Sequence, residues 1–216
     1  MEKHPANVTK VFARVEMSQF EIIAITLSFI VGIGIAQLLT SFSEAIRSRI
    51  EHPLHWMPFA WGIPILLLSV QYWFGLFDLD SALSDWNWFW YLQMLAMAMA
   101  LFMAATLILP PRKAATEGGL LVDFTTHGRY ALLALVVYLL GWLPANAVMN
   151  NNDVLYAGNI ANVAMAMPAL IAYKSRSNKI WIVSTVIFYV VFAITFFGLY
   201  STPGSEEGFL FVPADS

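Results

Sequence analysis

Long apolar segments constrain the fold of this chain more than any other feature of its sequence. The apolar core of a bilayer is about 30 Å thick, and a helix needs roughly 20 apolar residues to cross it. Six segments meet this requirement: residues 20–43, 57–77, 87–109, 128–148, 154–173 and 179–200. We expect each to be a helix, because lipid offers no hydrogen bonds to an open backbone. The sequence therefore predicts an all-α, polytopic transmembrane helix bundle with six spanning helices.

The composition excludes several classes of protein. Apolar residues make up 59% of the chain and charged residues 12%, with a mean hydropathy of +0.68. A soluble domain carries about twice that share of charge. The absence of cysteine excludes disulfides, thiolate metal sites and cysteine nucleophiles. The net charge of −3 gives no sign of nucleic-acid binding, so we expect no nucleic-acid partner.

The basic residues predict the orientation of the helices. After residue 16, every Lys and Arg lies in or beside the connection that follows the first, third or fifth span. These residues are Arg47, Arg49, Arg112, Lys113, Arg129, Lys174, Arg176 and Lys179. Connections rich in Lys and Arg stay in the cytoplasm. We therefore expect both termini outside.

The spans leave little chain outside the membrane. We expect an N-terminal tail over residues 1–16, the six-helix transmembrane domain over 17–200 and an acidic C-terminal tail over 201–216. The first tail holds three basic residues on the predicted outer side, against the charge pattern. Met17 is therefore a candidate for the true start of the chain.

A helix-capping pattern opens the first span. Ser18 and Glu21 form the sequence S-x-x-E directly before a long apolar run. In a capping box of this kind the two side chains accept hydrogen bonds from N–H groups of the first turn. A carboxylate also suits the positive end of the helix dipole. We therefore expect Glu21 to cap the helix rather than to act as an acid inside the membrane.

Polar and small residues share one face of the first span, in its predicted cytoplasmic half. Their spacing of three, four and three residues places them on one side of a helix. They are Gly34, Gln37, Ser41 and Glu44. Gly32 and Ala36 add a small-xxx-small pair, which lets another helix approach closely. The favoured interpretation is a helix-packing face, and the alternative is the lining of a cavity open to the cytoplasm.

Four side-chain amides lie at a matching depth in the predicted outer half of the bundle, with a threonine near them. This outer polar layer comprises Gln71, Gln93, Asn159, Asn162 and Thr195. Unpaired amides are costly in hydrocarbon, so these side chains must face one another, another subunit or water. The favoured interpretation is hydrogen bonding between helices, and the alternative is a site for binding or permeation.

The sequence offers no enzyme motif. It contains no G-x-S-x-G, no phosphate loop and no pair of carboxylates within the spans. His52, His55 and His127 fall on the predicted cytoplasmic side, but their spacing lacks the geometry of a zinc enzyme. We expect no catalytic residues, no metal and no cofactor.

The chain resembles a family of small six-helix bacterial inner-membrane proteins that open with Phe-Glu-Ile. Three stretches carry the resemblance: "MSQFEIIAITLSFIVGIGIAQLL", "HWMPFAWG…VQYWF" and "LILPP". It covers roughly residues 17–200 and implies a multi-pass protein of the bacterial inner membrane, without implying an activity.

Two functions are compatible with these features. The leading hypothesis is a non-enzymatic, oligomeric channel or transporter, in which the outer polar layer serves a small solute or ion. The alternative is an accessory or sensor subunit that acts by helix–helix contact with another membrane protein. The expected partners are the lipid bilayer and either a second copy of the chain or another membrane protein.

Overall fold

The computed structural model describes residues 18–47, 55–109 and 119–199, and the regular structure in these ranges is helical. Six long helices account for most of it: α1 (Gln19–Arg47), α2 (Trp56–Ala82), α3 (Trp88–Leu107), α5 (Arg129–Met149), α6 (Ala157–Lys174) and α7 (Asn178–Ile194). Three segments of five residues extend them: α4 (Gly119–Asp123) and the π-helical η4 (Phe124–Gly128) and η5 (Thr195–Leu199). The all-α prediction is confirmed.

Five helical stretches in the described ranges are long and apolar enough to cross a membrane. They correspond to α1, α2, α3, the continuous stretch Leu120–Met149 and the stretch Asn178–Gly198. The predicted fifth span is the helix α6, but its 18 residues include two asparagines and a terminal lysine, which lower its hydropathy. The chain is thus a multi-pass membrane helix bundle. Its described ranges hold six long helices and five candidate spans, so the sixth crossing, by α6, and the placement of both termini outside stay predictions.

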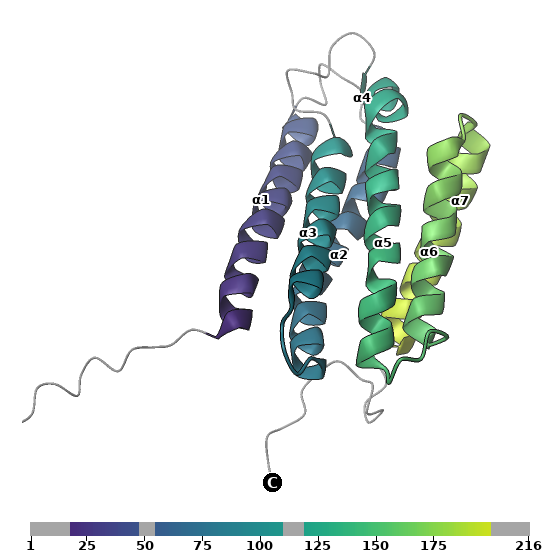
Figure 1. Cartoon of the computed structure of the whole chain (residues 1–216). Coiled ribbons are helices and arrows are strands. Elements are labelled where there is room, and N and C mark those ends of the chain that lie inside the picture. The colour runs from purple at the N-terminus through teal and green to yellow at the C-terminus, as the bar shows by residue number, and fades with distance from the viewer. Residues whose placement is uncertain (1–17, 48–54, 110–118, 200–216) are drawn as a thin grey trace, which may run out of the picture.

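The helices form two layers (Figure 1). α1, α3, α5 and α6 lie side by side in that order, and α2 lies behind them against α1, α3 and α5. α7 packs on α6 and also reaches α2, where the rings of Trp61 and Phe188 lie 4.9 Å apart. Next to this pair, the hydroxyl of Thr185 donates to the carbonyl of Trp181 at 2.8 Å and lies 3.7 Å from the sulfur of Met57. α2 is therefore covered by helices from both halves of the chain.

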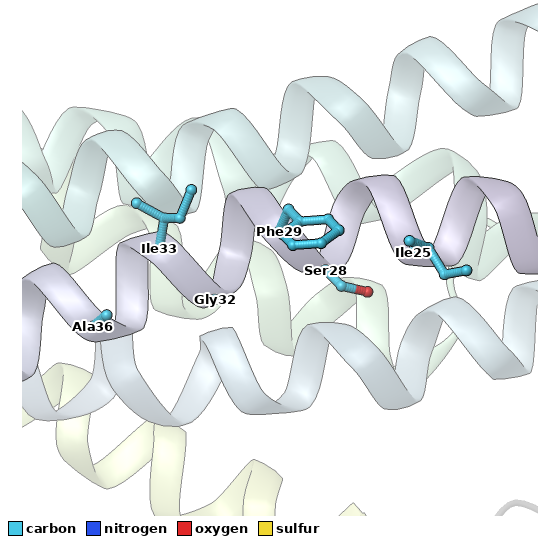
Figure 2. Close-up of a pocket in the computed structure, with 6 residues that line it drawn as sticks. All are labelled: Ile25, Ser28, Phe29, Gly32, Ile33 and Ala36. Atoms are coloured by element: carbon cyan, nitrogen blue, oxygen red, sulfur yellow. The ribbon is translucent and has the colours of Figure 1, made fainter.

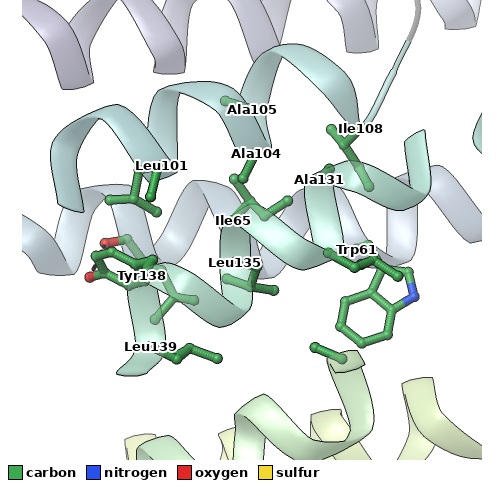
Figure 3. Close-up of a cluster of buried hydrophobic side chains, with 14 of the residues drawn as sticks. Trp61, Ile65, Leu101, Ala104, Ala105, Ile108, Ala131, Leu135, Tyr138 and Leu139 are labelled. Carbon is green, nitrogen blue, oxygen red and sulfur yellow. Dashed lines mark hydrogen bonds between the residues drawn. The ribbon is translucent and has the colours of Figure 1, made fainter. Parts of the chain in front are cut away.

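The core lies where α2, α3 and α5 meet (Figure 3). Ile65 of α2 packs there with Ala104 of α3 and Leu135 of α5, all fully buried. Buried tyrosines add hydrogen bonds to backbone carbonyls of neighbouring helices. The hydroxyl of Tyr72 donates to the carbonyl of Met94 at 2.9 Å, and that of Tyr138 to Leu68 at 3.3 Å. Because water is absent from a bilayer core, such bonds favour association of the helices.

Candidate functional site

The amide of Gln93 joins α3 to α5. Its Nε2 donates to the carbonyl oxygen of Gly141 at 2.6 Å. The glycine brings the two helices close, since a Cβ added there would lie 2.9 Å from Cγ of Met97. Gln93 therefore bonds the backbone of a neighbouring helix rather than another amide of the predicted layer.

Asn159 makes a similar contact from α6. Only 3% of the residue is exposed. Its Nδ2 donates to the carbonyl of Leu143 on α5 at 3.4 Å and to that of Val154, in the turn before α6, at 3.1 Å. Its Oδ1 is buried without a hydrogen-bond donor among the described residues. Gln93 and Asn159 thus bond carbonyls two residues apart on α5.

The other three members of the outer polar layer take no part in this arrangement. Thr195 is buried and donates to the carbonyl of Val191 in its own helical stretch, at 2.8 Å. Gln71 and Asn162 are half-buried on α2 and α6. Within the described ranges, no hydrogen bond joins one member of the layer to another. Gln93 and Asn159, the two members with interhelical hydrogen bonds, both donate to backbone carbonyls of α5.

The predicted polar face of α1 packs against α3 at one point of close approach. A Cβ added at Gly34 would lie 3.3 Å from Cα of Phe102, so the absence of a side chain lets the two backbones meet. Ser41 is buried on the same side of α1, while Gln37 and Glu44 are half-buried. Gly34 therefore packs closely on α3, whereas Oγ of Ser41 has no hydrogen-bond partner among the described residues.

Both hydrogen bonds of the capping box are present at the start of α1. The N–H of Ser18 donates to Oε2 of Glu21 at 2.7 Å, and the N–H of Glu21 donates to Oγ of Ser18 at 3.1 Å. Each side chain thereby satisfies the backbone N–H of the other residue. Glu21 is exposed and acts here as a helix cap.

An apolar groove of about 470 Å³ runs along the exposed side of α1 (Figure 2). Its lining residues are Ile25, Ser28, Phe29, Gly32, Ile33 and Ala36. The three small ones recur at every fourth position and form a line along the helix in Figure 2. Gly34, two residues on, faces α3, whereas a Cβ added at Gly32 would meet no atom within 4 Å. The sequence pattern predicted close packing at Gly32 and Ala36. Ser28 was not included in that prediction, although it extends the series by one helical turn.

A second pocket, of about 510 Å³ and more polar, lies at the other end of the bundle from Ser18. Residues of η4, the first turn of α5 and the turn between α6 and α7 line it. From the sequence, Arg129 and Arg176 are only indicators of orientation, and no pattern marks Thr125 or Thr126. Because these residues belong to segments about 50 positions apart, their proximity depends on the fold.

The histidines considered for a metal have other roles where they are described. Nδ1 of His55 accepts the N–H of Met57 at 3.3 Å and caps α2. Nδ1 of His127 lies 3.4 Å from Oδ1 of Asp123, one helical turn away. His52 lies outside the described residues. Among those that are described, no three His, Asp or Glu side chains gather in a group suited to a metal ion.

Comparison with known proteins gives no relative for this arrangement. No model of a protein family matches the chain, and neither a curated protein nor a solved structure matches it. The function must therefore be inferred from the geometry of the bundle.

Proposed function

We propose that this chain is a non-enzymatic membrane protein that acts through helix–helix contact, with the groove on α1 as its docking face. The occupant is α1 of a second copy of the chain. The observation that supports this proposal is the series of Ser28, Gly32 and Ala36, on a face without a neighbouring atom at Gly32.

Small residues at every fourth position have a specific effect in a membrane. A lipid-facing helix gains nothing from them, because lipid tails pack equally well on large apolar side chains. A second helix does gain, since its backbone approaches closely and dispersion contacts increase. Ile33 and Phe29, which is 69% exposed, stand beside the groove and offer a ridge to the same partner. Ridges of one helix pack into grooves of another.

A second copy meets the geometric conditions for this contact. Two copies inserted with the same topology carry the series at the same depth and in the same direction. Their α1 helices can therefore pair about a two-fold axis with the same surface on both sides. Residues 22–43 contain no charged side chain, so like charges do not oppose the pairing.

The outer polar layer supports contact rather than solute passage. Gln93 and Asn159 donate to carbonyls of α5. A solute that used these amides would have to replace hydrogen bonds that hold α3 and α6 to α5. Neither of the two pockets described above includes a member of the layer.

Cysteine cross-linking tests the proposal directly, since the chain has no native cysteine. Gly32→Cys should form a covalent dimer under mild oxidation in native membranes. Val190→Cys is the control, because it is exposed on α7, away from the groove. No dimer from Gly32→Cys, or equal dimer yields from both variants, would overturn the proposal. A cross-link from Gly32→Cys to a different protein would overturn the second copy as the occupant.

Measurement of the oligomeric state provides a second test. Ala36→Leu fills the groove and should raise the dissociation constant of the dimer by about tenfold or more, equivalent to about 1.4 kcal/mol. Ala193→Leu adds the same side chain at an exposed position of α7 and should leave the dimer unchanged. Solute flux into proteoliposomes that Gln93→Leu abolishes would favour the channel or transporter instead.

A further inference from the structure

The pocket at the start of α5 contains a guanidinium that has no ionic partner among the described residues. Nε of Arg129 is buried and has no hydrogen-bond acceptor among the described residues. The guanidinium carbon lies 4.9 Å from the ring centre of Tyr173 and 6.0 Å from that of Tyr130. These rings attract the cation through their π faces but supply no hydrogen-bond acceptor in the plane of the guanidinium. An arginine held in this way keeps its planar set of donors available for an anion.

The turn between α6 and α7 forms the facing wall of the pocket. The indole Nε1 of Trp181 fixes this turn by donating to the carbonyls of Ala172 at 3.0 Å and Ser175 at 3.2 Å. Oγ of Ser175 accepts the N–H of Ser177 at 3.0 Å, so its own proton remains available for donation. Arg176, on the same turn, is exposed and adds a second positive charge to the lining.

Among the described residues that line the pocket, no group compensates its positive charge. The hydroxyls of Thr125 and Thr126 both donate to the carbonyl of Val122, at 2.9 and 2.8 Å, and so form a neutral wall. The described residues that line the pocket include no carboxylate. Asp123 is the acidic residue closest in sequence to Arg129, and its carboxylate lies beside His127.

The backbone at this point departs from a regular α-helix. The π-helical η4 ends at Gly128 and immediately precedes Arg129. A Cβ added at Gly128 would lie 3.3 Å from the carbonyl oxygen of Ile108, so the glycine lets this segment approach the end of α3. π-helical turns inside longer helices occur frequently at functional sites. Here the π turn lies directly before Arg129, and its residues Thr125 and Thr126 line the same pocket.

We propose that this pocket binds a phosphate group, with Arg129 as its principal ligand and Arg176 and Ser175 as further donors. Arginine matches phosphate because its planar donors bond two oxygen atoms at once. The pocket lies at the end of the bundle, level with the first turn of α5, where a spanning helix reaches the headgroup region. The phosphate therefore comes either from an anionic phospholipid or from a soluble phosphate compound, which share this chemistry.

Two binding measurements on the full chain distinguish these sources. In the first, nanodiscs of phosphatidylcholine with and without phosphatidylglycerol are compared, and the lipid that stays bound is identified by native mass spectrometry. In the second, inorganic phosphate is titrated against the protein in nanodiscs of phosphatidylcholine alone. Retention of phosphatidylglycerol identifies the lipid headgroup as the source, and saturable binding of inorganic phosphate identifies a soluble one. Failure of both probes to bind would overturn the proposal.

Matched charge variants separate a defined site from general attraction to a basic surface. Arg129→Gln should weaken binding of the successful probe by at least about tenfold, because a charged hydrogen-bond donor is lost. Arg176→Gln should weaken binding of the probe by a smaller factor. This variant still tests the site if Arg129→Gln accumulates poorly. Lys179→Gln removes the same charge from the exposed first turn of α7, outside the pocket, and should change binding less than twofold. Equal losses from Arg176→Gln and Lys179→Gln would overturn the proposal.

Discussion

The hydroxyl of Tyr189 on α7 donates to the carbonyl oxygen of Ala60 on α2 at 2.7 Å. Pro64 has no N–H, so the Ala60 carbonyl has no partner four residues further along its own helix. The tyrosine supplies the donor that the proline removes, from a position 129 residues away in sequence. The hydrogen-bond donor that α2 lacks at Pro64 is therefore supplied by α7.

This hydrogen bond predicts coupling between two substitutions. Tyr189→Phe should lower the free energy of unfolding by about 0.6 kcal/mol, the average for hydrogen bonds between membrane helices, and by at most about 1.7 kcal/mol. Pro64→Ala restores a backbone N–H that can donate to the Ala60 carbonyl. Tyr189→Phe should therefore lower the free energy of unfolding less in the Pro64→Ala variant than in the unchanged protein. The measurement is unfolding in mixed detergent micelles. Equal losses in both backgrounds would show that the carbonyl does not need the tyrosine.

The amides Gln93 and Asn162 should respond differently to replacement by leucine. Gln93→Leu removes the bond to Gly141 and should destabilise the protein by about 0.5–1.5 kcal/mol. Asn162 is half-buried and has no hydrogen-bond partner within the described chain, so Asn162→Leu should leave stability unchanged or raise it. Melting temperatures in detergent give the comparison. A larger loss from Asn162→Leu would indicate a partner for Asn162 in a second subunit.

The capping box of α1 predicts losses that are not additive. Ser18→Ala should cost about 1 kcal/mol, the typical value for the loss of an N-cap side chain. Glu21→Ala should cost less, and the double variant should cost less than the sum, because the two hydrogen bonds form one unit. Ser43→Ala, at an exposed position of the same helix, is the control. Strict additivity in thermal melts would contradict the reciprocal bonding.

His55 predicts a dependence of stability on pH. Burial lowers the pKa of its imidazole below the ordinary value of 6.5. As pH falls through that value the unfolded chain takes up a proton that the folded protein resists, so stability should fall and then level off below the folded pKa. His55→Asn keeps a capping acceptor without a titrating group and should flatten this change. Melting curves between pH 7.5 and about 5 test it; an unchanged slope in His55→Asn would assign the effect to another group.

Hydropathy and local motifs predicted the helices and the cap at Ser18 because both depend on short stretches of chain. The second helix nevertheless continues to Ala82, beyond the predicted end of the apolar run at residue 77. Asp78 and Asp80 lower the hydropathy there without ending the helix. Oδ1 of Asp80 accepts the indole N–H of Trp86 at 2.7 Å, which gives the charged end of the helix a partner.

The contacts of the polar residues were less accessible to sequence analysis. A rise of about 1.5 Å per residue gives the depth of each amide, but not its rotation about the helix axis or its neighbouring helix. The acceptors of Gln93 and Asn159 are backbone carbonyls, which leave no signature in the sequence. The π turn before Arg129 likewise has no sequence signature that we recognised, and the residues of the pocket come together only in the folded chain.

The contact between α2 and α7 has a consequence for the synthesis of this protein. Residues 60 and 189 leave the ribosome roughly 6 to 26 s apart at a rate of about 5–20 residues per second. Throughout that interval the Ala60 carbonyl lacks its donor and Trp61 lacks the ring of Phe188. In a nascent chain that stops before α7, α2 therefore lacks these two contacts. We expect such a chain to be a substrate for proteases that remove unassembled membrane proteins.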